Sequence, residues 1–273
     1  MSEHKEKFRK ELEKPPIRAD YLGSKKLLGK NAVITGGDSG IGRAVAVHYA
    51  REGANVAIVY LKNDKDAEQT KTMVEEEGQQ CLLIKGDLSS QSFCKTIAEK
   101  AMATFRHIHI LVNNAGMHED EQKLKDISKA QLVRTFEVNI FPFFYLTSYL
   151  LEHMMEGNVI INTASVTAYR GSDHLIDYAS TKGAIVSFTR SLAKNLADQK
   201  IRVNAVAPGP IWTPLVINAF STEQLKKFGK DAPMGRAGYP YEVAPAYVYL
   251  ACDHSSYVTG QVMHVTGGDV VNG

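Results

Sequence analysis

Short apolar runs alternate with amphipathic, helix-like stretches from about residue 30 to residue 265, and this alternation constrains the fold more than any other feature. The runs are almost wholly apolar, which is typical of strands whose two faces are both covered by helices. A repeated strand–helix–strand order predicts an α/β fold with a parallel, doubly wound sheet of about seven strands and helices on both faces. The expected strands are residues 31–35, 56–61, 81–85, 108–112, 159–163, 201–206 and 262–265.

The stretches between these strands predict helices by their spacing of apolar residues. The clearest are residues 41–52, 64–77, 178–196 and 243–251, with another that ends near residue 105. The chain from the fourth strand to residue 155 suggests one long helical region. A further helix-prone segment, residues 215–227, follows Pro214 and is expected to form a mobile lid over the substrate.

The chain has 273 residues, enough for one large domain, and residues 29–273 are expected to form it. Residues 1–28 differ in composition, with a dense run of charges followed by Pro15 and Pro16. Such a segment has too few apolar groups to fold alone. We expect it to be an arm, ordered and extended from about residue 10 to 25, that crosses the body or a neighbouring subunit.

Composition excludes several classes of function. The net charge is +2, from 32 basic and 30 acidic residues, and gives no reason to propose a nucleic acid or membrane partner. No apolar run reaches the length of a membrane span, and the charged first residues do not resemble a secretory signal. The three cysteines have neither metal-site nor disulfide spacing, which favours a reducing, cytoplasmic location without a metal site.

Polar and glycine residues follow five of the expected strands, at the positions where ligands bind in open α/β sheets. After the first strand comes the turn Gly36, Asp38, Ser39, Gly40, Ile41 and Gly42, which leads into a helix. Glycines let a backbone approach a pyrophosphate closely, and the helix start offers free N–H groups. The spacing is TGxxxGIG, so it is not the common GxGxxG dinucleotide fingerprint.

This turn resembles that of the short-chain dehydrogenase/reductase family, which has a Rossmann-type fold, and the resemblance extends from about residue 28 to 271. It implies an NAD(P) site. Asp87 and Leu88 are similar to the family's adenine-side pair, although Asp87 alone could equally cap the next helix. The remaining matches are the NNAG motif with Asn114, Ala115 and Gly116, and the nicotinamide-side residues Pro208, Gly209, Ile211 and Thr213. The NNAG motif could also simply support the sheet.

The end of the second strand bears on the choice of cofactor. Tyr60 stands where NAD-specific relatives carry an acid that repels a 2′-phosphate, and Leu61 and Lys62 follow it. Lys62 could bind that phosphate or could be solvated on the loop. The sequence therefore predicts use of both NADP and NAD, with a slight preference for NADP.

Catalysis is expected from Tyr178 and Lys182, which lie four residues apart and so share one helix face. A nearby ammonium favours the phenolate, so that the tyrosine can exchange a proton with the substrate oxygen. By resemblance, Ser165 polarises that oxygen, Lys182 also holds the cofactor ribose, and Asn139 holds a water that links Lys182 to solvent. Asn139 alone could instead satisfy neighbouring backbone, although Asn is unfavourable inside a helix.

The resemblance implies an oxidoreductase acting on a small carbonyl or alcohol: an aldehyde, a ketone or a sugar-like molecule. It points most to the bacterial general-stress and aldehyde-reductase branch, which also carries a charged arm. Alternatives are a 3-oxoacyl-carrier-protein reductase, disfavoured by the acidic residues 119–121, and a non-catalytic cofactor-binding regulator. Residues 169–176 and 211–230 are expected to line the substrate pocket, with His174 the histidine best placed to do so.

Family members are usually homotetramers, and this is expected here. Residues 136–151 carry more aromatic surface than one packed helix face needs, which suggests either an interface or a deeply buried helix. The aromatic residues are Phe141, Phe143, Phe144, Tyr145 and Tyr149.

Overall fold

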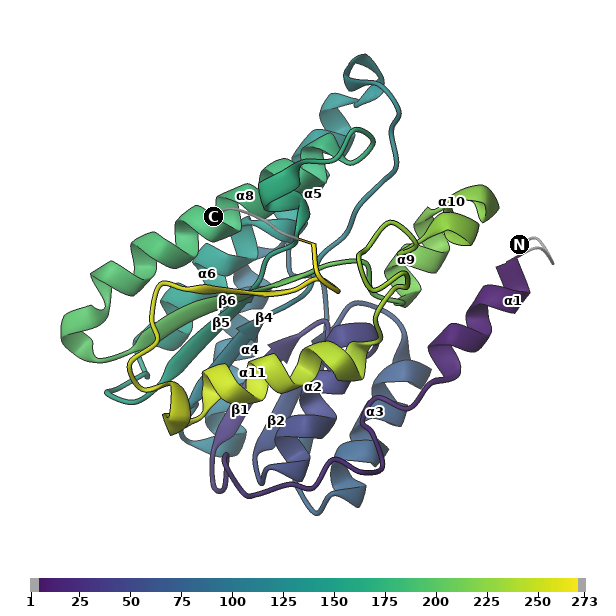
Figure 1. The fold of residues 1–273 in the computed structure, drawn as a ribbon. Coiled ribbons are helices and arrows are strands. Elements are labelled where there is room, and N and C mark those ends of the chain that lie inside the picture. Colours follow the sequence, from purple (N-terminus) through teal and green to yellow (C-terminus); the bar gives the residue numbers. More distant parts are fainter. Residues whose placement is uncertain (1–4, 270–273) are drawn as a thin grey trace.

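A seven-stranded sheet in the order β3-β2-β1-β4-β5-β6-β7 forms the centre of the computed structural model, which describes residues 5–269 (Figure 1). Every neighbouring pair is parallel, as the strand–helix alternation predicts. The strands are β1 (Asn31–Thr35), β2 (Asn55–Tyr60), β3 (Cys81–Lys85), β4 (Ile110–Asn113), β5 (Val159–Thr163), β6 (Arg202–Pro208) and β7 (Val262–Val265).

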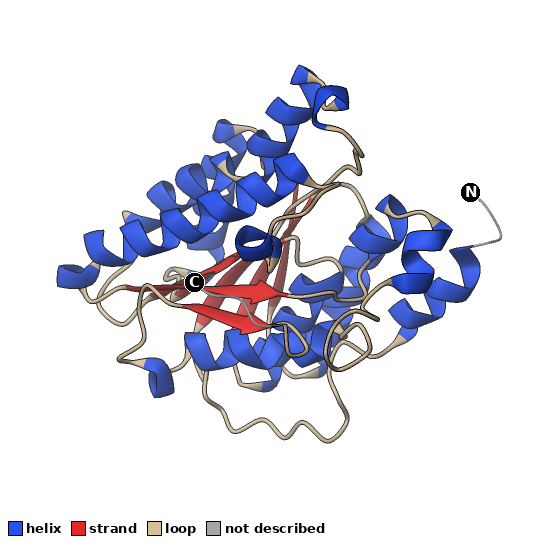
Figure 2. Cartoon of the chain, turned by 45° about the horizontal axis from the view of Figure 1, so that its top comes forward, coloured by secondary structure: helices blue, strands red, loops and turns tan. Residues whose placement is uncertain are grey.

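Helices cover both faces of the sheet (Figure 2). One layer contains α2 (Gly40–Arg51), α3 (Asp64–Glu76) and α11 (Pro240–Ala251), and the other contains α4 (Gln91–Phe105), α5 (Lys129–Asn139), α6 (Phe141–Leu151) and α8 (Ile176–Asn195). Because successive side chains of a strand point to opposite faces, Ile34 packs into the first layer and Val33 into the second. The strands β1 and β5 near the middle of the sheet are buried along their whole length. The predicted doubly wound fold is confirmed.

The expected long helical region is wrong, because the chain breaks at Ile140. The helix α5 ends at Asn139, and α6 begins at Phe141 with Pro142 in its first turn. Proline has no backbone N–H and cannot continue a preceding helix, which accounts for the break. Four short helical turns complete the described part of the body: η3 (Leu124–Asp126), α7 (Thr167–Arg170), η4 (Ala197–Gln199) and η5 (Asp253–Ser255).

The predicted lid is two short helices rather than one, α9 (Pro214–Ala219) and α10 (Thr222–Lys227). Ser221 and Gln224 form a capping box that starts α10 and so separates it from α9. Within the described residues, no helix is both long and apolar enough to span a membrane.

The N-terminal arm begins with a helix, although an extended segment was expected from about residue 10. It consists of α1 (Glu6–Arg9) and the 3₁₀ turn η2 (Lys10–Glu13), which lie beside α9 and α10 in Figure 1. The chain then runs along the outside of the same subunit to β1. It is fastened at the buried carboxylate of Glu52, which accepts hydrogen bonds from the Tyr21 hydroxyl (2.6 Å) and from the backbone N–H groups of Ser24 and Lys26 (3.0 Å each).

Candidate active site

A cleft of about 820 Å³ opens where the carboxyl ends of the strands meet. Three of the four expected catalytic residues line it: Ser165, Tyr178 and Lys182. So do all the expected cofactor residues except Gly42, namely Gly36, Asp38, Ser39, Gly40, Ile41, Tyr60, Leu61, Lys62, Asp87, Leu88, Asn114, Ala115, Gly116, Tyr178, Lys182, Pro208, Gly209, Ile211 and Thr213. Gly42 and Asn139 do not line the cleft. Gly42 packs against the glycine-rich turn, and Asn139 lies behind the cleft wall.

The glycine-rich turn has the geometry of an anion-binding loop. Gly36 adopts φ +65°, a left-handed conformation that favours glycine. A Cβ on Gly42 would lie 2.0 Å from the carbonyl oxygen of Gly36, so only glycine lets α2 start this close to the turn. Ser39 precedes α2 but forms no side-chain cap, so it leaves the N–H groups of the first turn without that partner. Free N–H groups at a helix start fit the pyrophosphate of a dinucleotide.

The NNAG segment both lines the cleft and supports the turn. The hydroxyl of Thr35 accepts hydrogen bonds from the backbone N–H groups of Asn114 (2.9 Å) and Ala115 (3.0 Å). The Asn114 side chain donates to the carbonyls of Thr35 (3.0 Å) and Gly36 (3.3 Å). The NNAG motif therefore does support the sheet, which the sequence left open. Its residues also line the cleft.

Asp87 faces the cleft from the end of β3 and is not a helix cap, since Ser90 caps α4. Burial alone would raise the pKa of Asp87. Hydrogen bonds from Ser89 and the guanidinium of Arg134 outweigh it and lower that pKa. Arg134, whose role the sequence did not reveal, lies 2.9 Å from the Asp87 carboxylate and also lines the cleft.

At the end of β2 the cleft presents the side chain of Lys62, whereas the nearby Arg43 is already engaged. Arg43 pairs with Asp66 at 3.4 Å and donates to the Asp38 carbonyl at 2.6 Å. The Tyr60 hydroxyl donates to Asp64 at 2.9 Å. Lys62 is exposed on the cleft wall and forms no ion pair among residues 5–269.

Tyr178 and Lys182 share the cleft-facing side of α8, with the lysine Nζ 5.4 Å from the centre of the tyrosine ring. The Lys182 ammonium donates to the carbonyl of Thr163 (2.8 Å) at the end of β5. Burial raises the pKa of Tyr178 to about 12, although an interaction with the Ser165 hydroxyl opposes the rise. Burial also lowers the pKa of Lys182 to about 7. Desolvation therefore outweighs the expected effect of the ammonium, and the phenol of the protein alone is protonated at neutral pH.

Asn139 lies behind the cleft wall, at the end of α5 and not in a helix interior as expected. Its side chain holds both backbone groups of Met117: the oxygen accepts from the N–H (2.8 Å) and the amide donates to the carbonyl (2.9 Å). A third bond joins it to the hydroxyl of Thr181 (3.1 Å). Asn139 thus satisfies neighbouring backbone, the alternative left open by the sequence, and connects the NNAG segment to α8.

His118 is a pocket residue, although the sequence favoured His174 as the histidine of the substrate pocket. Both line the cleft, but His118 is the one that packs edge-on against Tyr178, with ring centres 5.3 Å apart. Burial lowers the pKa of His118 to about 4, so its imidazole is neutral. In the sequence, only its position directly after NNAG and Met117 indicates that His118 could line the pocket. No periodic pattern of residues indicates it.

Asp177 is another residue whose role the sequence did not reveal, although it lies behind the cleft and does not line it. It is buried next to Tyr178 and accepts hydrogen bonds from the hydroxyl of Thr135 (2.8 Å) and the amide of Gln131 (3.3 Å). Both partners lie on α5, so Asp177 fixes the start of α8 against α5 and thereby positions the tyrosine. In the sequence its only signal is its place directly before Tyr178.

Comparison with known proteins agrees with this geometry. The family model described as enoyl-(acyl carrier protein) reductase matches residues 36–269. General stress protein 39 of Bacillus subtilis is 53% identical over 252 residues, which cover 92% of this chain and 88% of that protein. The chloroplastic NADPH-dependent aldehyde reductase 1 of Arabidopsis thaliana is 51% identical over 261 residues, with 93% and 91% covered.

Solved structures give the same result. A short chain dehydrogenase from Burkholderia cenocepacia in complex with NADP has a TM-score of 0.84 at 28% identity, with 89% of this chain and 98% of that chain covered. The 3-ketoacyl-(acyl-carrier-protein) reductase of Brucella melitensis, complexed with NADH, has a TM-score of 0.82 at 34% identity, with the same coverage. The predicted family is confirmed: the chain belongs to the short-chain dehydrogenase/reductase family.

Proposed function

We propose that this protein is an NAD(P)-dependent oxidoreductase that reduces a small aldehyde or ketone, or oxidises the corresponding alcohol. The observation that supports this most is the meeting of Ser165, Tyr178 and Lys182 with the glycine-rich turn in one cleft. The similarity to an aldehyde reductase favours an aldehyde among the possible substrates. An intact set of proton-transfer groups disfavours a regulator that only binds the cofactor.

The chemistry divides between cofactor and protein. NAD(P) supplies or accepts the hydride when bound. The chain's own groups orient and polarise the substrate: the Ser165 hydroxyl donates to the carbonyl oxygen, and Tyr178, protonated at neutral pH, gives that oxygen its proton. By family resemblance Lys182 would hold the ribose, and Asn139 positions the segment around Met117. The water relay through Asn139 rests on family resemblance.

The cofactor site suits both dinucleotides, with a preference for NADP. The end of β2 presents Tyr60 rather than an acid, and Lys62 offers a positive charge to a 2′-phosphate. Similar structures contain NADP in one case and NADH in another, which supports dual use.

The test of this function is a cofactor-oxidation assay against a panel of aldehydes and ketones, with Tyr178→Phe as the variant. The variant lacks the proton donor but keeps the ring, so we expect reduction to fall at least about 100-fold. Binding of NADPH, followed by fluorescence titration, should remain within about two-fold of the parent. Turnover in Tyr178→Phe comparable to the parent would disprove the assignment.

A 3-oxoacyl-carrier-protein reductase is the second candidate, supported by the Brucella melitensis structure. The acidic carrier requires a basic rim, and the exposed Lys227 on α10 provides one charge there. Across from it, Asp120 accepts a hydrogen bond from Gln224 at 3.0 Å, and Glu119 is exposed. This acidic segment disfavours the carrier. Reduction of acetoacetyl thioesters faster than of any simple aldehyde would reverse this choice.

For location and assembly we propose a cytoplasmic homotetramer. Cys81, Cys94 and Cys252 are buried and unpaired, which suits a reducing compartment. On α6, Phe143 is buried, but Phe141 and Phe144 remain 39% and 54% exposed, as an interface requires.

A further inference from the structure

The N-terminal helix, residues 6–13, packs directly on the lid. Phe8 and Leu12 join a cluster whose buried members include Ile217 of α9, Leu225 of α10 and Phe220 between the two helices. The lid helices are only six residues long each. Helices this short are marginal in water and depend on packing, so the arm supplies part of what keeps the lid folded.

A continuous series of ring contacts leads from the arm to the site of chemistry. Phe8 stacks on Trp212 (ring centres 6.1 Å apart), and Trp212 contacts Phe228 at 4.9 Å. Phe228 contacts Phe220 at 5.8 Å. Phe220 in turn lies 5.5 Å from His118, the residue that packs against Tyr178. Phe220 and Phe228 line the cleft, so their placement shapes the pocket.

Polar contacts tie the same helix to both the lid and the body. The Lys5 ammonium donates to the carbonyl of Ile217 (3.1 Å) near the carboxyl end of α9, where a positive charge is favourable. The Glu11 carboxylate accepts from the hydroxyl of Tyr239 (2.7 Å), which begins α11. Because α11 is part of the core, the helix connects the lid to a rigid part of the molecule.

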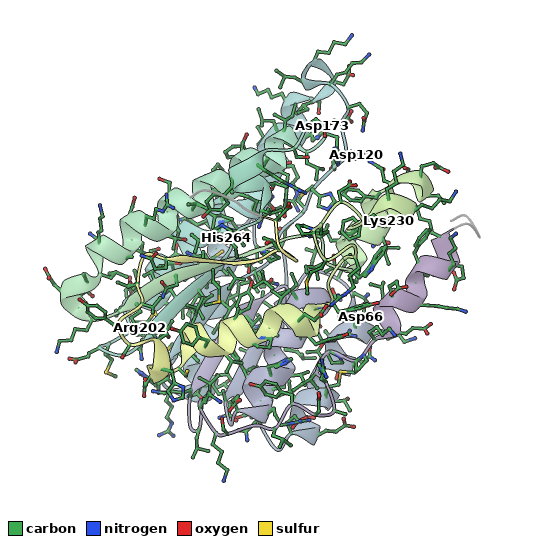
Figure 3. All side chains as sticks on the ribbon, in the orientation of Figure 1. Asp66, Asp120, Asp173, Arg202, Lys230 and His264 are labelled. Atoms are coloured by element: carbon green, nitrogen blue, oxygen red, sulfur yellow. The ribbon has the colours of Figure 1, made fainter. Side chains whose placement is uncertain are left out.

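The root of the arm is fixed as well. Glu52, at the end of α2, holds Tyr21, Ser24 and Lys26. The arm is therefore attached to the body at α2 and at α11, and its helix packs on the lid. Figure 3 shows Asp120 and Asp173 near each other, on two segments that are joined by a hydrogen bond from the Glu121 N–H to the His174 carbonyl (3.0 Å).

We propose that the N-terminal helix holds the lid in place over the substrate pocket, with Phe8 and Leu12 acting as positioning residues for Phe220 and His118. Substrate affinity then depends on the arm, whereas proton transfer at Tyr178 and cofactor binding at the glycine-rich turn do not. This rests on the proposed function, since it assumes that the pocket beside Tyr178 receives the carbonyl substrate.

The test compares the double variant Phe8→Ala/Leu12→Ala with Leu22→Ala in the full chain. Leu22 is a matched control, because it is an apolar residue of the same arm that is 84% exposed. The double variant should raise KM for the aldehyde roughly ten-fold and change kcat by less than about three-fold. The dissociation constant for NADPH without substrate should stay within about two-fold, and Leu22→Ala should match the parent throughout.

Trp212 gives a readout independent of activity, because it is the only tryptophan in the chain and lies between Phe8 and Phe228. In the double variant its emission should shift to the red and acrylamide should quench it more strongly. Amide exchange should also accelerate in residues 214–228 but not in β1.

The outcomes separate the arm's role from the proposed function. If no carbonyl compound is turned over by the parent, the proposed function fails, while fluorescence and exchange still decide whether the arm holds the lid. Unchanged fluorescence and exchange in the double variant would overturn the inference. So would a changed lid with an unchanged KM, because the arm would then be a structural support only.

Discussion

At the residue scale, the proposed preference for NADP rests on Lys62, together with the absence of an acid at Tyr60. Arg43 is committed to Asp66 and the Asp38 carbonyl, so it cannot turn toward a 2′-phosphate without losing these bonds. Lys62 forms no such ion pair among the described residues, and it lies on the cleft wall.

We therefore expect Lys62→Ala to raise KM for NADPH roughly ten-fold, the value of one lost bond to a charged group, and to leave KM for NADH unchanged. Lys65→Ala is the control, since Lys65 is exposed nearby and does not line the cleft. Steady-state kinetics with both cofactors measure this. Equal losses with NADPH and NADH would mean that Lys62 does not recognise the phosphate.

Among the secondary-structure elements, α9 and α10 are the ones expected to move. They are short, and they carry cleft residues such as Val216 and Gln224 while sharing few buried side chains with the sheet layers. Segments with little buried apolar area open at low cost.

Hydrogen exchange in residues 214–228 should accordingly be slower with NADP and an alcohol together than in the free protein. Helix α2, in the core, serves as the internal reference. Equal protection of residues 214–228 in both states would show that these helices are a fixed wall and not a lid.

At the scale of the whole molecule, stability should depend on pH through His48. Burial lowers its pKa to about 4, whereas in the unfolded chain the pKa is near 6.5. The unfolded state therefore binds the proton first, and the contribution of neutral His48 is present above pH 6.5 and lost as pH falls toward 4. The shift corresponds to at most about 3 kcal/mol.

Urea unfolding at pH 7.5 and 5 should show this loss in the parent and a smaller one in His48→Gln. The exposed His254, changed to Gln, is the control and should behave as the parent does. An equal loss of stability in parent and His48→Gln would assign the acid sensitivity to other groups.

Assembly is the second prediction at this scale. If α6 forms an interface, Phe144→Ser should divide the tetramer into smaller species, because it removes exposed aromatic area from the contact. Tyr257→Ser, at a fully exposed aromatic residue outside α6, should not. Light scattering gives the masses, and an unchanged mass for Phe144→Ser would exclude α6 from the interface.

The sequence by itself determined the sheet and the glycine-rich turn. Apolar runs such as Asn31–Thr35 and Val159–Thr163 have the same bounds in the structure. Strand formation follows local hydrophobicity and the turn residues that bound each apolar run. Gly36 and Gly42 are likewise local requirements of backbone geometry. Helix ends were less predictable: the prediction of one long helical region overlooked the break at Ile140, although Pro142 marks it in the sequence.

Only the tertiary structure decided how the site is completed. His118 and Tyr178 are sixty residues apart, and no sequence period reports that their rings meet. The pKa of Tyr178 moved opposite to the sequence argument, because burial is a property of all surrounding elements together and outweighed one neighbouring charge. The same burial lowers the pKa of Lys182, for which the sequence made no prediction. The sequence shows that the arm has a few apolar groups, but it does not show what they contact. Only the folded chain brings Phe8 and Leu12 onto the lid, because tertiary packing joins residues that are far apart in the sequence.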